Sequence, residues 1–153
     1  MKIGFIGAGE MGGAIIRGLL SKGYPKEDIL ADNVRVIREA NWLFLAVKPA
    51  QVAAVLQQIA ACGTPAKPLI SMALGWSVEK IQQVLPSWPV IRIMPNTPLA
   101  LGEGVTLFHF AQETPKRTRR EVMALFDGLG KTFEISLPLF EAATAGSCYG
   151  PAF

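Results

Sequence analysis

Residues 1–20 of the chain read MKIGFIGAGEMGGAIIRGLL. Residues 3–6 form a short apolar run that predicts a buried strand, and residues 11–20 follow a helical pattern. A G-x-G-x-x-G motif lies between the two. A strand, a glycine turn and a helix in this order are the context in which the motif indicates a site for the pyrophosphate of a dinucleotide. A glycine-rich turn that binds nothing is the alternative interpretation.

The three glycines of the motif have different expected tasks. Gly7 permits the tight turn, Gly9 lets a pyrophosphate approach the backbone, and Gly12 lets the helix pack closely on the strand. The N-terminus of the helix offers free N–H groups and a partial positive charge. The sequence therefore predicts a phosphate-binding turn directly after the first strand.

The composition indicates one globular domain with a hydrophobic core. The chain has 153 residues, of which 50% are hydrophobic and 18% are charged. No run approaches the roughly 20 apolar residues of a membrane span. Cys62 and Cys148 lie far apart without metal-ligand spacing, so we expect two unpaired thiols in the cytoplasm and no metal site. The net charge of +3 includes a basic run at residues 116–120, which fits a solvated helix face better than a nucleic-acid site.

Strand patterns alternate with helical patterns along the whole chain. Strands are predicted at residues 3–6, 29–31, 42–47, 69–72, 90–94, 105–110 and 132–135. Helices are predicted at residues 11–20, 34–41, 51–61, 77–85 and 114–126, and a further helix begins near residue 138. This alternation predicts an α/β fold with a Rossmann-type, doubly wound and mostly parallel sheet.

The second and third predicted strands are unusually close in the sequence. Only a short helical stretch separates them, where a full helix and another strand would normally fit. We expect either that the protein is trimmed here or that a loop–helix–strand segment is missing near residues 31–34. Asp32 lies where a dinucleotide fold often places the acid that holds a ribose hydroxyl, but Asp32 and Asn33 also fit the N-cap of the next helix.

In an open parallel sheet, ligands bind outside the carboxyl ends of the strands. Four strand ends of this chain carry unusual loops, at residues 7–12, 46–49, 71–75 and 94–98. Because these loops would meet at one edge, they favour an extended ligand across the sheet. A dinucleotide has a suitable length.

Several polar residues near these strand ends are candidates for ligand contacts. Lys48 can meet a phosphate or a carboxylate as a compact charge, or it is an ordinary exposed lysine. Asn96 and Thr97 can offer an amide and a hydroxyl to a nicotinamide carboxamide, or they form only a turn between two prolines. His109 lies in an apolar strand, which favours a packed or solvated histidine over a catalytic one. With this single histidine the sequence shows no acyl-transfer triad.

Four motifs, spread in register over nearly the whole chain, resemble those of the pyrroline-5-carboxylate reductases. They read GFIGAGEM at residues 4–11, LFLAVKP at 43–49, SMALG at 71–75 and RIMPNTP at 92–98. The resemblance implies an oxidoreductase that reduces 1-pyrroline-5-carboxylate to L-proline with NADPH or NADH, the last step of proline biosynthesis. We name no catalytic side chain, because a protonated imine is already a good hydride acceptor once both molecules are positioned.

The resemblance also implies which residues bind the cofactor. Residues 6–11 would hold the pyrophosphate, residues 46–49 would line the cofactor cleft, and residues 72–74 would flank the nicotinamide. The family has an asparagine on the adenosine side at the position that Asn33 occupies relative to the Ala-Val-Lys-Pro block, which weakens Asp32 as the ribose acid. Together with the loop candidates, the predicted cofactor-binding set is Ile6, Gly7, Ala8, Gly9, Glu10, Met11, Asn33, Ala46, Val47, Lys48, Pro49, Met72, Ala73, Leu74, Asn96 and Thr97.

The resemblance divides the chain into a dinucleotide-binding Rossmann-like domain at residues 1–137 and the start of a helical domain at residues 138–153. In the family this helical domain makes an interlocked dimer and supplies much of the substrate pocket. We therefore expect catalysis to need the rest of that domain and a partner chain. The expected full-length protein is a dimer-based homo-oligomer in the cytoplasm with a small-molecule substrate and no nucleic-acid or membrane partner.

Two departures from the family pattern affect these expectations. Cys148 and Tyr149 replace small residues at the beginning of the helical domain. We expect the stretch that would read a 2′-phosphate to be missing from the sequence, so the choice between NADPH and NADH stays open.

Two alternative functions also stay open. One is a related enzyme of the same architecture, such as a dehydrogenase of the 3-hydroxyisobutyrate type or an NADP reductase of a deazaflavin. Such enzymes share the glycine motif but predict other residues at positions 48–49 and 96–98. The other is a nucleotide-binding module without catalytic activity.

Overall fold

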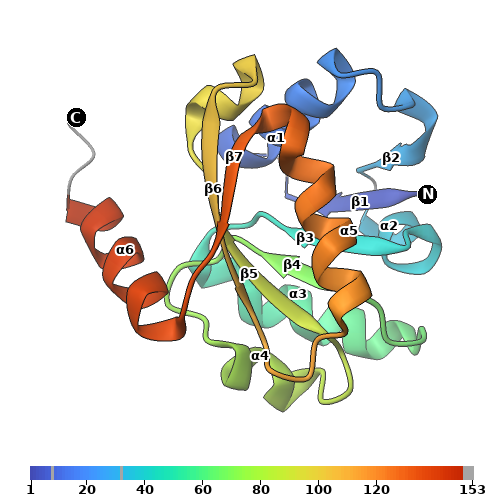
Figure 1. Cartoon of the computed structure of the whole chain (residues 1–153). Coiled ribbons are helices and arrows are strands. Elements are labelled where there is room, and N and C mark those ends of the chain that lie inside the picture. Colours follow the sequence, from blue (N-terminus) through green and yellow to red (C-terminus); the bar gives the residue numbers. More distant parts are fainter. Residues whose placement is uncertain (8, 32, 150–153) are drawn as a thin grey trace.

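A computed structural model describes residues 1–7, 9–31 and 33–149, with all their side chains except those of Asn33, Thr97 and residues 146–149. The described strands form one sheet in the order β2-β1-β3-β4-β5-β6-β7 (Figure 1). They are β1 (Ile3–Ile6), β2 (Ile29–Leu30), β3 (Trp42–Leu45), β4 (Leu69–Ser71), β5 (Val90–Met94), β6 (Gly104–Phe110) and β7 (Gly130–Glu134). Every neighbouring pair is parallel except β5 and β6, which run antiparallel.

Helices cover both faces of this sheet. They are α1 (Glu10–Ser21), α2 (Asn33–Glu39), α3 (Pro49–Cys62), α4 (Val78–Val84), α5 (Lys116–Phe126) and α6 (Leu137–Tyr149), with the short 3-10 helices η1 (Lys26–Asp28), η2 (Thr97–Leu101) and η3 (Asp127–Leu129). One hydrophobic core joins α1 and α5 to the sheet, and a second joins α2, α3 and α4 to its other face. The predicted Rossmann-type, doubly wound and mostly parallel α/β fold is confirmed.

Successive side chains of the central strands point alternately into these two cores. Phe5 and Phe44 stack on the α1 side with ring centroids 4.7 Å apart. Ile6 and Leu45 belong to the core on the α3 side. Burial on both faces explains why these strands are continuous apolar runs in the sequence, as in parallel sheets generally.

Several helix ends follow the local signals in the sequence. The Ser77 hydroxyl accepts a hydrogen bond of 3.1 Å from the backbone N–H of Lys80, which makes Ser77 the N-cap of α4. Pro49 occupies the first turn of α3. Gly63 ends the same helix with a φ of +63°. These caps fix where α3 and α4 leave the sheet.

The connection between β2 and β3 passes through α2 alone. Gly4 of β1 lies beneath α2, where a Cβ would overlap the helix side chain above it, so α2 packs directly on the strand. Lys67 Nζ donates hydrogen bonds of 2.8 Å to the carbonyl oxygens of Ile37 and Ala40, which satisfies the carboxyl end of α2. In the described part of the chain β2 is an edge strand. A missing segment near residues 31–34 stays a prediction.

The last helix, α6, stands at the side of the sheet, next to β6 and β5 (red in Figure 1). Phe140 in its first turn is buried, and its ring centroid lies 6.1 Å from that of His109 on β6. Glu141 pairs with Arg92 on β5. In the ranges that the structure describes, no helix is long and apolar enough to cross a membrane.

Candidate functional site

The turn after β1 has a backbone that only glycine fits. Gly7 has a φ of +77°, and a Cβ there would lie 2.6 Å from Val47 Cγ1 and 2.8 Å from the Ala46 carbonyl oxygen. The backbone N–H of Ala46 donates a hydrogen bond of 2.9 Å to the carbonyl oxygen of Ile6. The glycine predicted for the tight turn therefore also allows the loop after β3 to lie directly against it.

The other two glycines of the motif have contrasting surroundings. Gly9 is the exposed N-cap of α1, and a Cβ there would meet nothing within 4 Å. A Cβ at the buried Gly12 would lie 3.1 Å from the Gly7 carbonyl oxygen and 3.2 Å from Ala46 Cβ. Gly12 thus lets α1 lie close to the strand ends, whereas Gly9 leaves open space above the first turn of the helix. Open space over a helix N-terminus suits a phosphate group.

Strand register brings the four predicted loops to one edge of the sheet. Ile6 pairs with Leu45, and Leu45 pairs with Ser71, so β1, β3 and β4 end side by side. The backbone N–H of Met72 donates to the Leu45 carbonyl oxygen at 3.1 Å, which extends the pairing into the loops. Since β5 is parallel to β4, the loop at residues 94–98 leaves from the same edge.

A hollow of about 610 Å³ opens beside the glycine turn. Ile6, Gly7 and Val47 from the predicted set line it. The other lining residues come from β1, the end of β2 and one face of α3, and they are Phe5, Ala31, Ala50, Gln51, Ala54, Val55 and Gln58. The contribution of α3 was missed from the sequence. Its spacing of three, four and seven residues is a signal for one helix face, although it does not say what that face meets.

The loop after β4 lies further along the same edge. Met72 is half-buried against the core beneath α1. Ala73 is buried, and its backbone N–H donates to the Ser71 hydroxyl at 3.2 Å. Leu74 is 40% exposed. This loop therefore presents apolar side chains at the sheet edge, as a surface flanking a nicotinamide ring would require, and its ligand role stays a prediction.

The loop after β5 uses one of its candidate groups to build the fold. The Oδ1 atom of Asn96 accepts a hydrogen bond of 2.9 Å from the backbone N–H of Val105 at the start of β6. This bond connects the turn to the next strand and supports the interpretation of Asn96 as a turn residue. The amide nitrogen of Asn96 takes no part in the bond. The side chain of Thr97 lies outside the described residues.

Of the remaining predicted residues that the structure describes, three are exposed and one packs against the core. Lys48 is exposed in extended backbone at the N-cap of α3, and Pro49 follows it in the first helical turn. Glu10 is exposed in the first turn of α1, and Met11 packs against the core beneath that helix. Two predicted groups, Ala8 and the side chain of Asn33, lie outside the described residues, as does Asp32.

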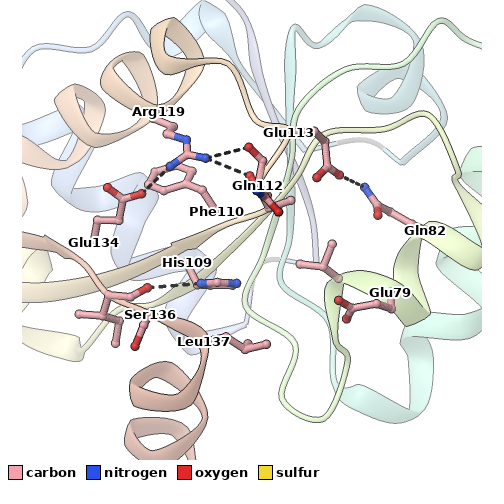
Figure 2. Close-up of a pocket in the computed structure, with 13 residues that line it drawn as sticks. Glu79, Gln82, His109, Phe110, Gln112, Glu113, Arg119, Glu134, Ser136 and Leu137 are labelled. Atoms are coloured by element: carbon pink, nitrogen blue, oxygen red, sulfur yellow. Dashed lines mark hydrogen bonds and ion pairs between the residues drawn. The ribbon is translucent and has the colours of Figure 1, made fainter.

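A second hollow, of about 650 Å³, lies elsewhere (Figure 2). It lies at the carboxyl end of β6, and because β6 runs antiparallel to β5 this is the opposite edge from the glycine turn. Arg119 is bound to Glu134 at 2.8 Å and to two backbone carbonyl oxygens at 3.2 Å (Figure 2). The Gln82 amide donates to Glu113 at 3.0 Å and lowers the pKa of that carboxyl. Arg119, Glu134 and Glu113 are thus already bonded to other groups, and this hollow lies away from the glycine turn, so it is a poor candidate for the dinucleotide site.

The single histidine faces this second hollow. His109 Nδ1 lies 3.3 Å from the carbonyl oxygen of Ile135, and the residue is half-buried (Figure 2). Of the two predicted alternatives, a packed or a solvated histidine, these contacts fit the packed one. Over residues 1–7, 9–31 and 33–149, no group of three or more His, Cys, Asp and Glu side chains could hold a metal ion. Cys62 is a free thiol.

The strand, glycine turn and helix at the edge of a doubly wound sheet have the architecture of the Rossmann dinucleotide-binding class. The family described as "NADP oxidoreductase coenzyme F420-dependent" matches residues 2–35, the part that carries the glycine motif. Over nearly its whole length the chain is similar to curated pyrroline-5-carboxylate reductases. The reductase of Haemophilus influenzae is 34% identical over 173 aligned positions, which cover 99% of this chain and 64% of the relative.

Solved structures show the same relationship. The pyrroline carboxylate reductase of Plasmodium falciparum with NADP bound aligns with a TM-score of 0.86 and 26% identity, over 99% of this chain and 64% of that one. The reductase of Coxiella burnetii aligns with a TM-score of 0.85 and 25% identity, over 99% and 65%. This chain thus spans less than two thirds of its relatives' length. Because the alignment with the Haemophilus protein is longer than this chain of 153 residues, that relative has residues within the matched region that have no counterpart here.

Proposed function

We propose that this chain is the cofactor-binding part of an enzyme that reduces 1-pyrroline-5-carboxylate to L-proline with NADPH or NADH, the last step of proline biosynthesis. The observation that carries the proposal is the meeting of four loops, those after β1, β3, β4 and β5, at one edge of the sheet. Homology along nearly the whole chain supports the particular reaction. The match at residues 2–35 covers the first strand, the glycine turn, α1 and β2, an arrangement that many dehydrogenases share, and it does not discriminate among them.

The described residues fit a dinucleotide. Gly9 leaves open space over the first turn of α1, where free N–H groups meet a pyrophosphate. Gly7 and Val47 begin the hollow that would take the adenosine half. Met72 and Leu74 lie along the edge toward the other half. When bound, the reduced nicotinamide supplies the hydride, and the chain's own residues orient the cofactor and exclude water from one side of it.

The rest of the proposal concerns the complete protein. Its substrate is a small molecule, and its active form is a dimer-based homo-oligomer in which further helices complete the substrate pocket. The protein works in the cytoplasm, without a nucleic-acid or membrane partner. No acid–base pair is required of the described residues, because a protonated imine accepts a hydride once it is positioned.

A titration with each nicotinamide cofactor tests the cofactor part of this proposal. Intrinsic fluorescence or calorimetry of the 153-residue chain should show saturable binding of NADPH, NADH or both. No saturable binding of either would contradict it.

The reaction is tested in a longer protein that includes the helical region of the relatives. It should form proline from 1-pyrroline-5-carboxylate and should not oxidise 3-hydroxyisobutyrate. The reverse result would favour the hydroxy-acid dehydrogenase alternative, and cofactor binding without either activity would favour a non-catalytic module.

A further inference from the structure

We propose that the adenosine end of this site does not select for a 2′-phosphate, so that the chain binds NADH at least as tightly as NADPH. This inference rests on the proposed function and names the cofactor class that the site takes. It follows from the chemistry of the hollow beside the glycine turn.

The position of this hollow makes it the adenosine end. It begins at Ile6 and Gly7, where the pyrophosphate turn starts, and it reaches Ala31 directly after β2. In dinucleotide-binding sheets the ribose of the adenosine half is bound next to the end of the second strand. A cofactor whose pyrophosphate lies over Gly9 therefore places its ribose 2′ position in or beside this hollow.

The described lining of the hollow is electrically neutral. The wall that faces the glycine turn is one face of α3, with the methyl group of Ala54 between the side chains of Gln51 and Gln58. The rest of the described lining comes from β1, the glycine turn, the end of β2 and the loop after β3, and it is entirely apolar: Phe5, Ile6, Gly7, Ala31 and Val47. Lys48 is exposed at the N-cap of α3 and is not a lining residue. Among the residues that the structure describes, the only polar side chains on these walls are thus two exposed glutamine amides.

A 2′-phosphate brings close to two negative charges, and NADP-binding sites usually meet it with an arginine. Charge-assisted hydrogen bonds are about twice as strong as neutral ones. A glutamine amide donates equally well to a ribose hydroxyl or to a phosphate oxygen, but as a neutral group it adds no charge pairing. The 2′-phosphate therefore loses bound water on entering the hollow and gains no charged partner in return. NADH, which lacks this phosphate, binds at least as tightly as NADPH.

The shortened connection after β2 agrees with this conclusion. The segment after the second strand is where a Rossmann fold carries the residue that recognises the 2′ position. Here the described connection from β2 to β3 consists of α2, which packs directly on β1. The side chain of Lys67 caps the carboxyl end of this helix. The described connection holds no additional strand beside Ala31.

Paired titrations of the 153-residue chain with NADPH and NADH, at one fixed salt concentration, test the inference. We expect the dissociation constant of NADH to equal or to lie below that of NADPH. A dissociation constant that is lower for NADPH than for NADH would overturn the inference and leave the proposed function standing. If neither cofactor binds, the cofactor part of the proposed function is wrong and the inference fails with it.

Introducing an arginine tests whether this hollow is where the 2′ position lies. Gln58→Arg and Gln51→Arg place a cation on the lining face of α3, and at least one should tighten NADPH relative to NADH by about tenfold. Gln57→Arg is the matched control, because Gln57 is exposed on the same helix but does not line the hollow. If all three variants keep the wild-type ratio of the two dissociation constants, the adenosine end lies elsewhere and the inference is overturned.

Discussion

The guanidinium of Arg92 and the carboxylate of Glu141 meet at 2.6 Å, with the arginine side chain 3% exposed and the glutamate side chain 52% exposed. The arginine lies in the middle of β5, and its Cζ is 4.9 Å from the ring centroid of Phe140. A charge that lies this deep in the sheet needs its counter-charge. Arg92 therefore anchors α6 to the sheet through two successive residues of that helix.

Glu141→Gln should lower the free energy of unfolding by about 1–3 kcal/mol, because Arg92 would stay buried without an anionic partner. Urea denaturation measures this change. The control is Glu121→Gln, which removes a pair of 2.9 Å with Arg117, whose side chain is 84% exposed. That change should cost less than about 0.5 kcal/mol. Equal costs at the two sites would contradict the anchoring role of Arg92.

Gly7→Ala should destabilise the chain by about 2–4 kcal/mol, because it adds a Cβ both to a backbone of positive φ and to a contact with Ala46 and Val47. Gly23→Ala is the comparison, since Gly23 has a φ of +89° with nothing within 4 Å of a Cβ. It should cost only about 1 kcal/mol. Thermal or urea unfolding that ranks Gly23→Ala as the more damaging change would refute the described packing of the turn.

Asn96→Ala should cost about 1 kcal/mol, because the backbone N–H of Val105 loses its acceptor. Asn96→Asp keeps an acceptor oxygen and should restore most of the stability. It also removes the amide nitrogen that was predicted to reach a nicotinamide. Unchanged cofactor affinity in Asn96→Asp would mean that this residue serves the turn alone.

Burial, followed by the nearby Asp28 charge, raises the pKa of the Tyr24 phenol above its ordinary value of 10.0. The hydroxyl donates a hydrogen bond of 2.6 Å to the Met1 carbonyl oxygen. An acid with a raised pKa contributes stability that is complete below the unfolded pKa and is lost as the pH rises through the folded one. The stability difference between wild type and Tyr24→Phe should therefore shrink above about pH 10. A difference that grows with pH would contradict the assigned direction.

Much of the fold could be predicted because local chemistry and burial agree. The apolar strand at residues 3–6, the requirement for glycine at position 7 and the cap at Ser77 each specify one conformation. Four loops at strand ends were enough to predict a common edge, since parallel strands share the direction of their carboxyl ends.

The parts that escaped prediction depend on contacts between distant segments. Whether Gln51 and Gln58 face the hollow beside the glycine turn depends on how α3 is rotated on the sheet, and their spacing does not reveal this rotation. The Asn96 bond to Val105 and the Arg92 pair with Glu141 likewise join separate elements. An arginine within an apolar strand such as β5 is a sequence signal for a buried charge that needs a partner, but it does not say which residue that partner is.

The central claim is that a dinucleotide lies against Gly9, and Gly9→Ala tests it most directly. A Cβ there meets no protein atom within 4 Å, so the unfolding midpoint should stay close to that of the wild type. The methyl group would occupy the space that a pyrophosphate needs, and cofactor affinity should fall by about tenfold or more. A stable variant that binds NADPH and NADH as tightly as the wild type would contradict the claim.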